Sequence, residues 1–229
     1  MSTVPPAPTI TEPARVDQGD VAALYDRLAA VYDVWGRLTE SRARQRALEL
    51  AAIRSGEDVL EIAVGTGLAF VEIVRRNPGG RNVGIDLSAG MLAQAERRLQ
   101  RAGLTRYRLS AGSARALAEP DQAFDVILNC YLFDLLEESL WATVLGEYRR
   151  VLKPAGRLVL VNMTVGEKPG SGIYQRMYRW SPRMMGGCRA VQLAGPLARH
   201  GFVVQSREYI QQCWLPSEVI RATRNPDAA

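Results

Sequence analysis

A short segment with two glycines, Glu61–Gly67 (Glu-Ile-Ala-Val-Gly-Thr-Gly), has the residue types of a ligand-binding turn. Gly65 and Gly67 allow the backbone to approach a ligand closely, and a helix that starts there offers unpaired N–H groups. Asp86 follows at the end of the next apolar run. A carboxylate in that position can accept two hydrogen bonds from the hydroxyls of a ribose. The glycines and the acid together predict a site for a nucleotide-like ligand.

The spacing of the glycines indicates which class of nucleotide the loop could bind. A dinucleotide-binding loop follows the pattern G-x-G-x-x-G/A, but the third position here is Phe70, whose ring would obstruct packing of the helix on the strand. Glu61 would also repel a pyrophosphate, whereas an acid suits a ligand that carries an ammonium group. These features disfavour a nicotinamide oxidoreductase, and a glycine turn without any ligand remains the alternative interpretation.

Apolar runs and helical patterns alternate around these residues, which predicts a parallel sheet covered on both faces. Ser88 is suited to cap the helix that follows Asp86. The last two strands are joined too briefly for a crossover helix, so they are expected to form an antiparallel pair. The expected strands cover residues 58–64, 82–86, 106–111, 124–130, 157–163, 202–210 and 214–222, and the expected helices cover residues 19–38, 41–53, 68–76, 88–102, 139–152 and 191–199.

The chain of 229 residues is long enough to form one domain with a sizeable core. Residues 1–18 are expected to form a disordered leader, because prolines are frequent between Val4 and Pro13. Residues 19–229 are expected to form a single domain, with an N-terminal helical cap over residues 19–55. Residues 165–189 are rich in Gly, Pro, Met and aromatic residues and are expected to form a lid or insertion.

The composition argues against several classes of protein. Hydrophobic residues make up 47% of the chain and no apolar run is long enough to span a membrane, so a globular domain is expected. Three cysteines without a C-x-x-C pair predict neither disulfides nor a metal site, and they favour a cytoplasmic location. The basic residues behind the net charge of +5 are scattered along the chain, so no nucleic-acid partner is expected.

Four segments in combination resemble class I S-adenosylmethionine-dependent methyltransferases: Val59–Gly67, Gly84–Leu92, Phe124–Ile127 and Arg149–Gly156. The opening segment Tyr25–Asp33 is similar to the branch that contains quinone-ring C-methyltransferases and bacterial phospholipid N-methyltransferases. The resemblance implies an α/β, Rossmann-like fold with a mostly parallel seven-stranded sheet. The implied strand order is 3-2-1-4-5-7-6, with strand seven antiparallel.

The resemblance also implies that the cofactor is S-adenosylmethionine, and it gives roles to individual residues. Glu61 would lie near the methionine ammonium group, and Asp86 would bind the ribose hydroxyls. The other cofactor-binding residues would be Ala63, Gly65 and Gly67 in the loop, Leu87, Met91, Ser113 and Ala114 around the adenine, and Asn129 and Cys130 near the sulfonium. For Met91 and Cys130, a packing role is the alternative.

The chain departs from the family pattern at three places. Ala63 stands where most members carry the first glycine of the loop, a change that is expected to be tolerated. Ser113 stands where an aspartate commonly contacts the adenine amino group, and a hydroxyl accepts that hydrogen bond more weakly than a carboxylate. The histidine–tryptophan pair of the quinone branch is missing after the opening helix. The acceptor is therefore not specified as a quinone.

Methyl transfer from a sulfonium needs positioning of the acceptor and, for many acceptors, a base that removes one proton. The base is unknown, and the candidates on the acceptor side are Tyr25, Tyr32, Tyr131 and Asp134. His200 is the sole histidine and is expected to cap a helix. The predicted function is methyl transfer to a small-molecule or lipid-headgroup acceptor. The alternative is a non-catalytic S-adenosylmethionine-binding regulatory protein on the same fold.

Three arginines at helical spacing, Arg176, Arg179 and Arg183, lie within the expected lid. A helix there either packs on the sheet or presents these arginines to an anionic group or an acidic membrane surface. Peripheral contact with a membrane surface is therefore one expectation, whereas the sequence does not indicate an oligomeric state.

Overall fold

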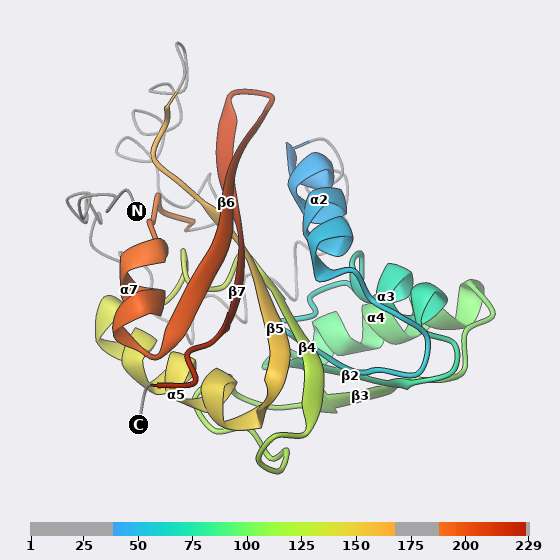
Figure 1. Ribbon diagram of the computed structural model, residues 1–229. Helices are drawn as coiled ribbons and strands as arrows, with labels where there is room; N and C mark the ends of the chain where they lie inside the picture. The colour runs from blue at the N-terminus through green and yellow to red at the C-terminus, as the bar shows by residue number, and fades with distance from the viewer. Residues whose placement is uncertain (1–38, 168–187, 228–229) are drawn as a thin grey trace.

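The computed structural model describes residues 39–167 and 188–227, and Figure 1 shows their arrangement. Strands and helices alternate through most of these residues, as the sequence patterns predict. The helices are α2 (Ser41–Ala51), α3 (Phe70–Arg76), α4 (Ala89–Arg101), the 3₁₀ helix η1 (Glu138–Leu140), α5 (Trp141–Val151) and α7 (Ala194–Arg199). The strands are β1 (Asp58–Ile62), β2 (Arg81–Asp86), β3 (Arg108–Ala111), β4 (Phe124–Cys130), β5 (Leu152–Met163), β6 (Phe202–Gln212) and β7 (Leu215–Arg224).

The seven strands form one sheet in the order β3-β2-β1-β4-β5-β7-β6. The strands β1 to β5 pair in parallel, and β7 pairs antiparallel with both β5 and β6. This arrangement confirms the α/β fold and the strand order implied by the resemblance. It also confirms the antiparallel pair at the C-terminal end of the chain.

The sheet has a hydrophobic core on each face, because alternate residues of a strand point to opposite sides. In β5, Leu158 and Leu160 pack into the core that contains residues of α5 and α7, whereas Val159 and Val161 pack into the core that contains residues of α2, α3 and α4. Figure 1 shows the same two layers, with α2, α3 and α4 to one side of the sheet and α5 and α7 to the other. The nearly continuous apolar runs of the sequence therefore reflect burial on both faces.

The start of β5 differs from the sequence expectation. Residues 153–156 lie between the expected helix 139–152 and the expected strand 157–163, but β5 begins at Leu152 and includes them. The register jumps between the pairs Phe124↔Leu152 and Val126↔Arg157, so the segment forms an irregularity inside the paired strand. Lys153 Nζ lies 2.8 Å from carboxylate oxygens of both Asp58 and Asp125, which ties this irregularity to the amino ends of β1 and β4. The other boundaries lie within three residues of the expected ones.

Parallel pairing brings the carboxyl ends of β1, β2 and β4 to one edge of the sheet. Ile62 pairs with Ile85 on one side and with Asn129 on the other, so the glycine-containing loop lies between Asp86 and Cys130. This edge is the expected place for a ligand in an open α/β sheet. The fold thus gathers residues from three separate sequence segments into one site.

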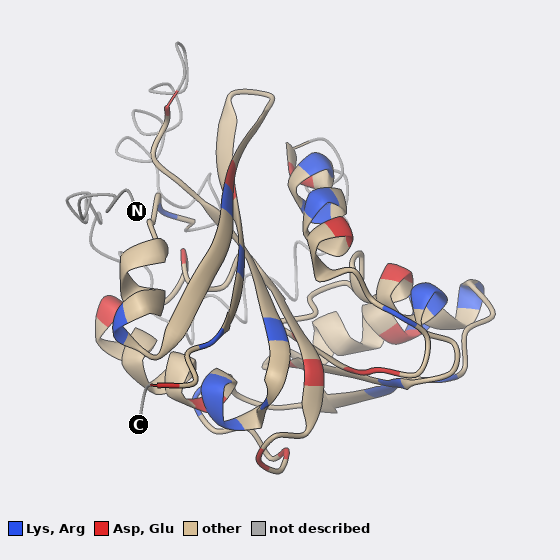
Figure 2. Ribbon diagram, in the orientation of Figure 1, with Lys and Arg blue, Asp and Glu red and all other residues tan. Residues whose placement is uncertain are grey.

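Several sequence expectations fall on residues outside the described part of the chain. They are the leader 1–18, the first helix 19–38 with Tyr25 and Tyr32, and most of the expected lid with Arg176, Arg179 and Arg183. Among the described residues, no helix is both long and apolar enough to cross a membrane. Basic and acidic residues are interspersed over the described elements, as Figure 2 shows.

Candidate functional site

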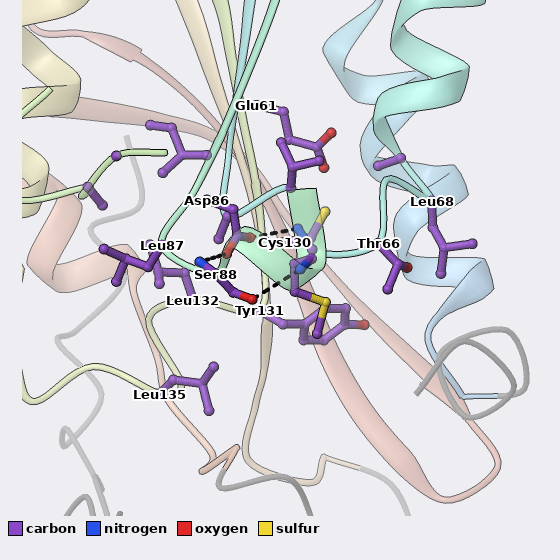
Figure 3. A pocket seen from close by; sticks show the side chains of 18 of the residues that line it. Glu61, Thr66, Leu68, Asp86, Leu87, Ser88, Cys130, Tyr131, Leu132 and Leu135 are labelled. Atoms are coloured by element: carbon purple, nitrogen blue, oxygen red, sulfur yellow. Dashed lines mark hydrogen bonds between the residues drawn. The ribbon is translucent and has the colours of Figure 1, made fainter. Parts of the chain in front are cut away.

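A cavity opens at the carboxyl edge of the sheet and reaches from β2 to the start of α2. Figure 3 shows Asp86, Ser88, Cys130 and Tyr131 gathered beside the glycine-containing loop, although they come from different strands. Of the residues predicted for cofactor binding, two do not line the cavity: Gly67, which packs against Ala95 of α4, and Asn129. The others do: Glu61, Ala63, Gly65, Asp86, Leu87, Met91, Ser113, Ala114 and Cys130. Sequence reasoning missed Glu40 and Arg44, which also line it.

The loop takes a left-handed backbone at Gly65, with φ of 56°, and at Gly67, with φ of 81°. A Cβ atom on Gly67 would lie 3.0 Å from the Cα and Cβ atoms of Ala95 in α4, so this glycine permits close packing of the loop on the helix. A Cβ atom on Gly65 would meet nothing within 4 Å. Because Gly65 lines the cavity, the open space beside it belongs to the ligand site.

Ala63 also has a left-handed backbone, with φ of 58°. An alanine in this conformation is strained by about 1 kcal/mol, which gives a physical reason for a glycine at this position in related loops. We expect the Ala63→Gly variant to raise the melting temperature by roughly 1–4 °C, since the relieved strain exceeds the added entropy of the unfolded chain. Thermal unfolding followed by circular dichroism measures this change.

The matched control is Ala52→Gly, at the C-cap of α2, where φ is 45°. Ala52 does not line the cavity, so both variants should gain stability, and only Ala63→Gly should change the flexibility of the loop. A lower melting temperature for Ala63→Gly would contradict the inferred strain.

Asp86 fixes the geometry of the loop. Its Oδ2 accepts a hydrogen bond from Gly65 N–H at 2.8 Å, and its Oδ1 accepts one from Ser88 N–H at 2.9 Å. Ser88 Oγ in turn accepts from Met91 N–H at 3.0 Å and caps α4, as predicted. A carboxylate can accept several hydrogen bonds at once, so the type of this side chain also suits a diol.

Glu61 is a buried acid at the end of β1. It is 2% exposed, and Oε2 has no hydrogen-bond partner among the described residues. Burial raises the pKa of Glu61 well above its usual value, the positive charge of Arg44 counteracts this, and Asp86 raises it further. A buried carboxylate without a partner is unfavourable, so this arrangement suits a ligand that brings a cation to Oε2.

The nucleotide end of the cavity is mainly apolar. Leu87 is 60% exposed at the rim, whereas Met91 is buried below it. Ser113 and Ala114 line the same region, and Ser113 Oγ accepts a hydrogen bond from Arg115 N–H at 3.2 Å. An exposed leucine beside a cavity provides an apolar surface that a flat ring could cover.

The residues at and beyond the end of β4 form two groups. Cys130 and Tyr131 line the cavity, and low exposure to water raises the pKa of both above their usual values. Tyr131 has a left-handed backbone, and its hydroxyl oxygen lies 3.0 Å from Ser217 Oγ. Asn129 and Asp134 are fully buried and do not line the cavity. Neither residue of the second group is therefore positioned to contact a ligand directly.

Asn129 and Asp134 instead hold the strand ends in place. Asn129 Nδ2 donates to Ile62 O at 2.7 Å, and Asp134 Oδ2 accepts from Met163 N–H at 3.2 Å. Burial raises the pKa of Asp134 to about 7. His200 is the C-cap of α7, where its N–H donates to Pro196 O and Leu197 O, as expected from the sequence.

The comparisons with known proteins agree with this geometry. Residues 59–156 match a family described as a methyltransferase domain. Over 159 residues the chain is 34% identical to a demethylmenaquinone methyltransferase of Thermus thermophilus, a match that covers 68% of this chain and 71% of the relative. Over 141 residues it is 34% identical to a phosphatidylethanolamine N-methyltransferase of Cereibacter sphaeroides, covering 61% of this chain and 66% of the relative.

Among solved structures, a SAM-dependent methyltransferase from Aquifex aeolicus superposes with a TM-score of 0.60 at 18% identity, covering 92% of this chain and all of the other. This likeness shows the shared fold. Against demethylmenaquinone methyltransferases of Tropheryma whipplei, Thermotoga maritima and Thermobifida fusca, the match covers 58–61% of the relative's length.

Proposed function

The chain belongs to the S-adenosylmethionine-dependent methyltransferases, and we propose that it transfers the methyl group to a small molecule or a lipid headgroup. The observation that carries this proposal is the buried Glu61 Oε2, which has no hydrogen-bond partner in residues 39–167 and 188–227. It lines the same cavity as the left-handed loop and the Asp86 carboxylate. Two acids thus line one cavity: Glu61, which suits an ammonium group, and Asp86, which suits a ribose. This donor set fits the methionine and ribose parts of S-adenosylmethionine.

Different residues of the cavity would contact different parts of the cofactor. Glu61 would bind the ammonium group and Asp86 the ribose hydroxyls, while Leu87 and Met91 would flank the adenine. When bound, the cofactor supplies a methyl group on a positively charged sulfur, already activated for displacement. The chain's task is then to orient the acceptor and to keep water away from it.

The acceptor end of the cavity supports an acceptor with an apolar body. Tyr131, Leu132, Leu135 and Leu136 line this part of the wall. The two curated relatives described above are named for a quinone precursor and for a phospholipid, both of which combine a reactive polar group with hydrocarbon. We infer an acceptor of this general type. We also propose a cytoplasmic location, which the low cysteine content of the sequence favours.

The proposal is tested by binding and turnover with defined compounds. We expect calorimetry to show saturable binding of S-adenosylhomocysteine and no binding of NAD. Methyl transfer is then followed as S-adenosylhomocysteine release, with either a reduced 2-prenyl-1,4-naphthoquinone in detergent or phosphatidylethanolamine vesicles as acceptor. Binding without transfer to any acceptor would favour a non-catalytic regulatory protein, and failure to bind S-adenosylhomocysteine would contradict the cofactor site.

A further inference from the structure

Glu40, immediately before α2, is a buried acid that the proposed cofactor contacts do not use. It lines the cavity and is 7% exposed. Its side chain makes no capping hydrogen bond to α2, and the charge of Arg44 only partly offsets the cost of its burial. An ionisable group held in this way is unfavourable for folding, so its position calls for a functional explanation.

The electrostatic neighbours of Glu40 place it at the acceptor end of the cavity. Its negative charge adds to the effect of burial in raising the pKa of Cys130, Tyr131 and Asp134, all at or beyond the end of β4. Cys130 and Tyr131 line the same cavity as Glu40. The Glu40 carboxylate therefore acts on the region where the apolar acceptor wall begins.

The other titratable groups near this region are less suited to accept a proton. Tyr131 and Cys130 keep their protons at neutral pH because low exposure to water raises the pKa of each. Asp134 does not line the cavity and accepts a backbone hydrogen bond from Met163. Glu61 faces the expected ammonium group of the cofactor. Among the described residues, Glu40 is the acid that remains available to an acceptor.

We propose that Glu40 takes up the proton that the acceptor loses during methyl transfer, an inference that rests on the proposed function. The acceptor would be a weakly acidic O–H or N–H compound with an apolar body, such as a quinol or a lipid amine. Its proton passes to the Glu40 carboxylate and later to water. The acceptor's electron pair forms the bond to the methyl carbon, and the carbon–sulfur pair goes to sulfur, which leaves S-adenosylhomocysteine. In a quinol, the displaced ring proton returns to the oxygen.

The protonation equilibrium of Glu40 is consistent with this role. Burial raises its pKa to about 7, and Arg44 on the same helix counteracts part of the rise. The other charged or titratable groups around this region are Glu61 from β1 and Cys130, Tyr131 and Asp134 from the β4 end. A base whose pKa lies near the working pH is ionised in a large fraction of the enzyme molecules, and it is still basic enough to remove a proton from the acceptor.

The test compares Glu40→Gln with Glu49→Gln, the same change at an exposed residue of α2. Glu49 pairs with Arg46 and lies outside the cavity. Three quantities are measured: affinity for S-adenosylhomocysteine, kcat/KM between pH 5.5 and 9, and the melting temperature of the ligand-free protein over that range. The acceptors are the reduced 2-prenyl-1,4-naphthoquinone and phosphatidylethanolamine vesicles, which distinguish a ring acceptor from a lipid headgroup.

For the wild type and Glu49→Gln, kcat/KM should rise with pH and level off above about 7. Glu40→Gln should be about 100-fold slower at pH 8 without this rise, and Glu40→Asp should restore part of it. Affinity for S-adenosylhomocysteine should be unchanged in all variants. Because burial raises the folded-state pKa of Glu40 to about 7, above its unfolded value, the wild type should lose stability relative to Glu40→Gln as pH rises from 5.5 toward 7. The difference should then level off, at roughly 5 °C at pH 8.

Four other outcomes would each overturn the proposed role of Glu40. Weaker binding of S-adenosylhomocysteine by Glu40→Gln would place Glu40 in the cofactor site and overturn its role toward the acceptor. Near-wild-type turnover with the pH dependence retained, or a melting-temperature difference that does not change with pH, would also overturn it. If the wild type binds S-adenosylhomocysteine but methylates neither compound, the proton-transfer role is overturned, while the cofactor site stands.

Discussion

Replacement of Asp86 by alanine is expected to weaken binding of S-adenosylhomocysteine by roughly 30- to 150-fold, or about 2–3 kcal/mol. The variant loses the acceptors for the ribose hydroxyls and, at the same time, the two hydrogen bonds from Gly65 and Ser88 N–H that set the loop. Both losses weaken ligand binding, because the loop must keep its left-handed turn for a ligand to approach the backbone. Calorimetric titration with S-adenosylhomocysteine measures the effect.

The matched control for Asp86 is Asp125→Ala at the opposite edge of the sheet. Asp125 Oδ2 also accepts a backbone hydrogen bond, from Asp58 N–H at 2.9 Å, but Asp125 lies at the amino end of β4. Its loss should lower the melting temperature and leave the affinity unchanged. Equal affinities for the wild type and Asp86→Ala would show that the ribose is bound elsewhere and would remove the basis for the cofactor site.

The fold and the nucleotide end of the site could be predicted because both follow from local patterns. Apolar runs such as Phe124–Cys130 predict strands that are buried on both faces, and the helix cap Ser88 predicts the start of α4. Since parallel strands end at one edge, residues that follow strands, such as Asp86 and Cys130, must come together there. No information from distant parts of the chain was needed for this step.

Other features of the fold and of the site could not be predicted, because they depend on contacts between residues far apart in sequence. Pro154 and Gly156 have the local signature of a turn, but the ion pairs of Lys153 hold the segment within β5. The left-handed φ of Ala63 is likewise set by the loop rather than by the preference of alanine.

Glu40 and Arg44 were missed for the same reason. Their place beside the cavity follows from the packing of α2 on β5 and β7, with Ala43 and Ala47 in a shared core with Val159 and Val219. A bidentate pair between Arg46 and Glu208, at 2.7 and 2.8 Å, further fixes the helix on β6. The sequence around residue 40 carries only the pattern of an amphipathic helix, which does not reveal what its first turn will face.

The second large effect is expected at Glu61, where replacement by glutamine should change stability and affinity in opposite directions. The ligand-free variant should melt at a higher temperature than the wild type, because it no longer buries a carboxyl group whose pKa burial has raised. Since the folded-state pKa lies above the unfolded value, this advantage should grow as pH rises through the folded-state pKa. Affinity for S-adenosylhomocysteine should fall by roughly 10- to 150-fold with the lost charge-assisted hydrogen bond.

A change of ligand separates the role of Glu61 from that of Asp86. The compound 5′-methylthioadenosine has the ribose and adenine but lacks the amino-acid part, so Glu61→Gln should bind it as tightly as the wild type does. Asp86→Ala should weaken binding of both compounds. If Glu61→Gln lost affinity for 5′-methylthioadenosine as well, Glu61 would be supporting the loop rather than meeting the ammonium group. If it lost stability without losing affinity for S-adenosylhomocysteine, the buried carboxylate would be structural, and the cation that its free oxygen is expected to bind would have to lie elsewhere.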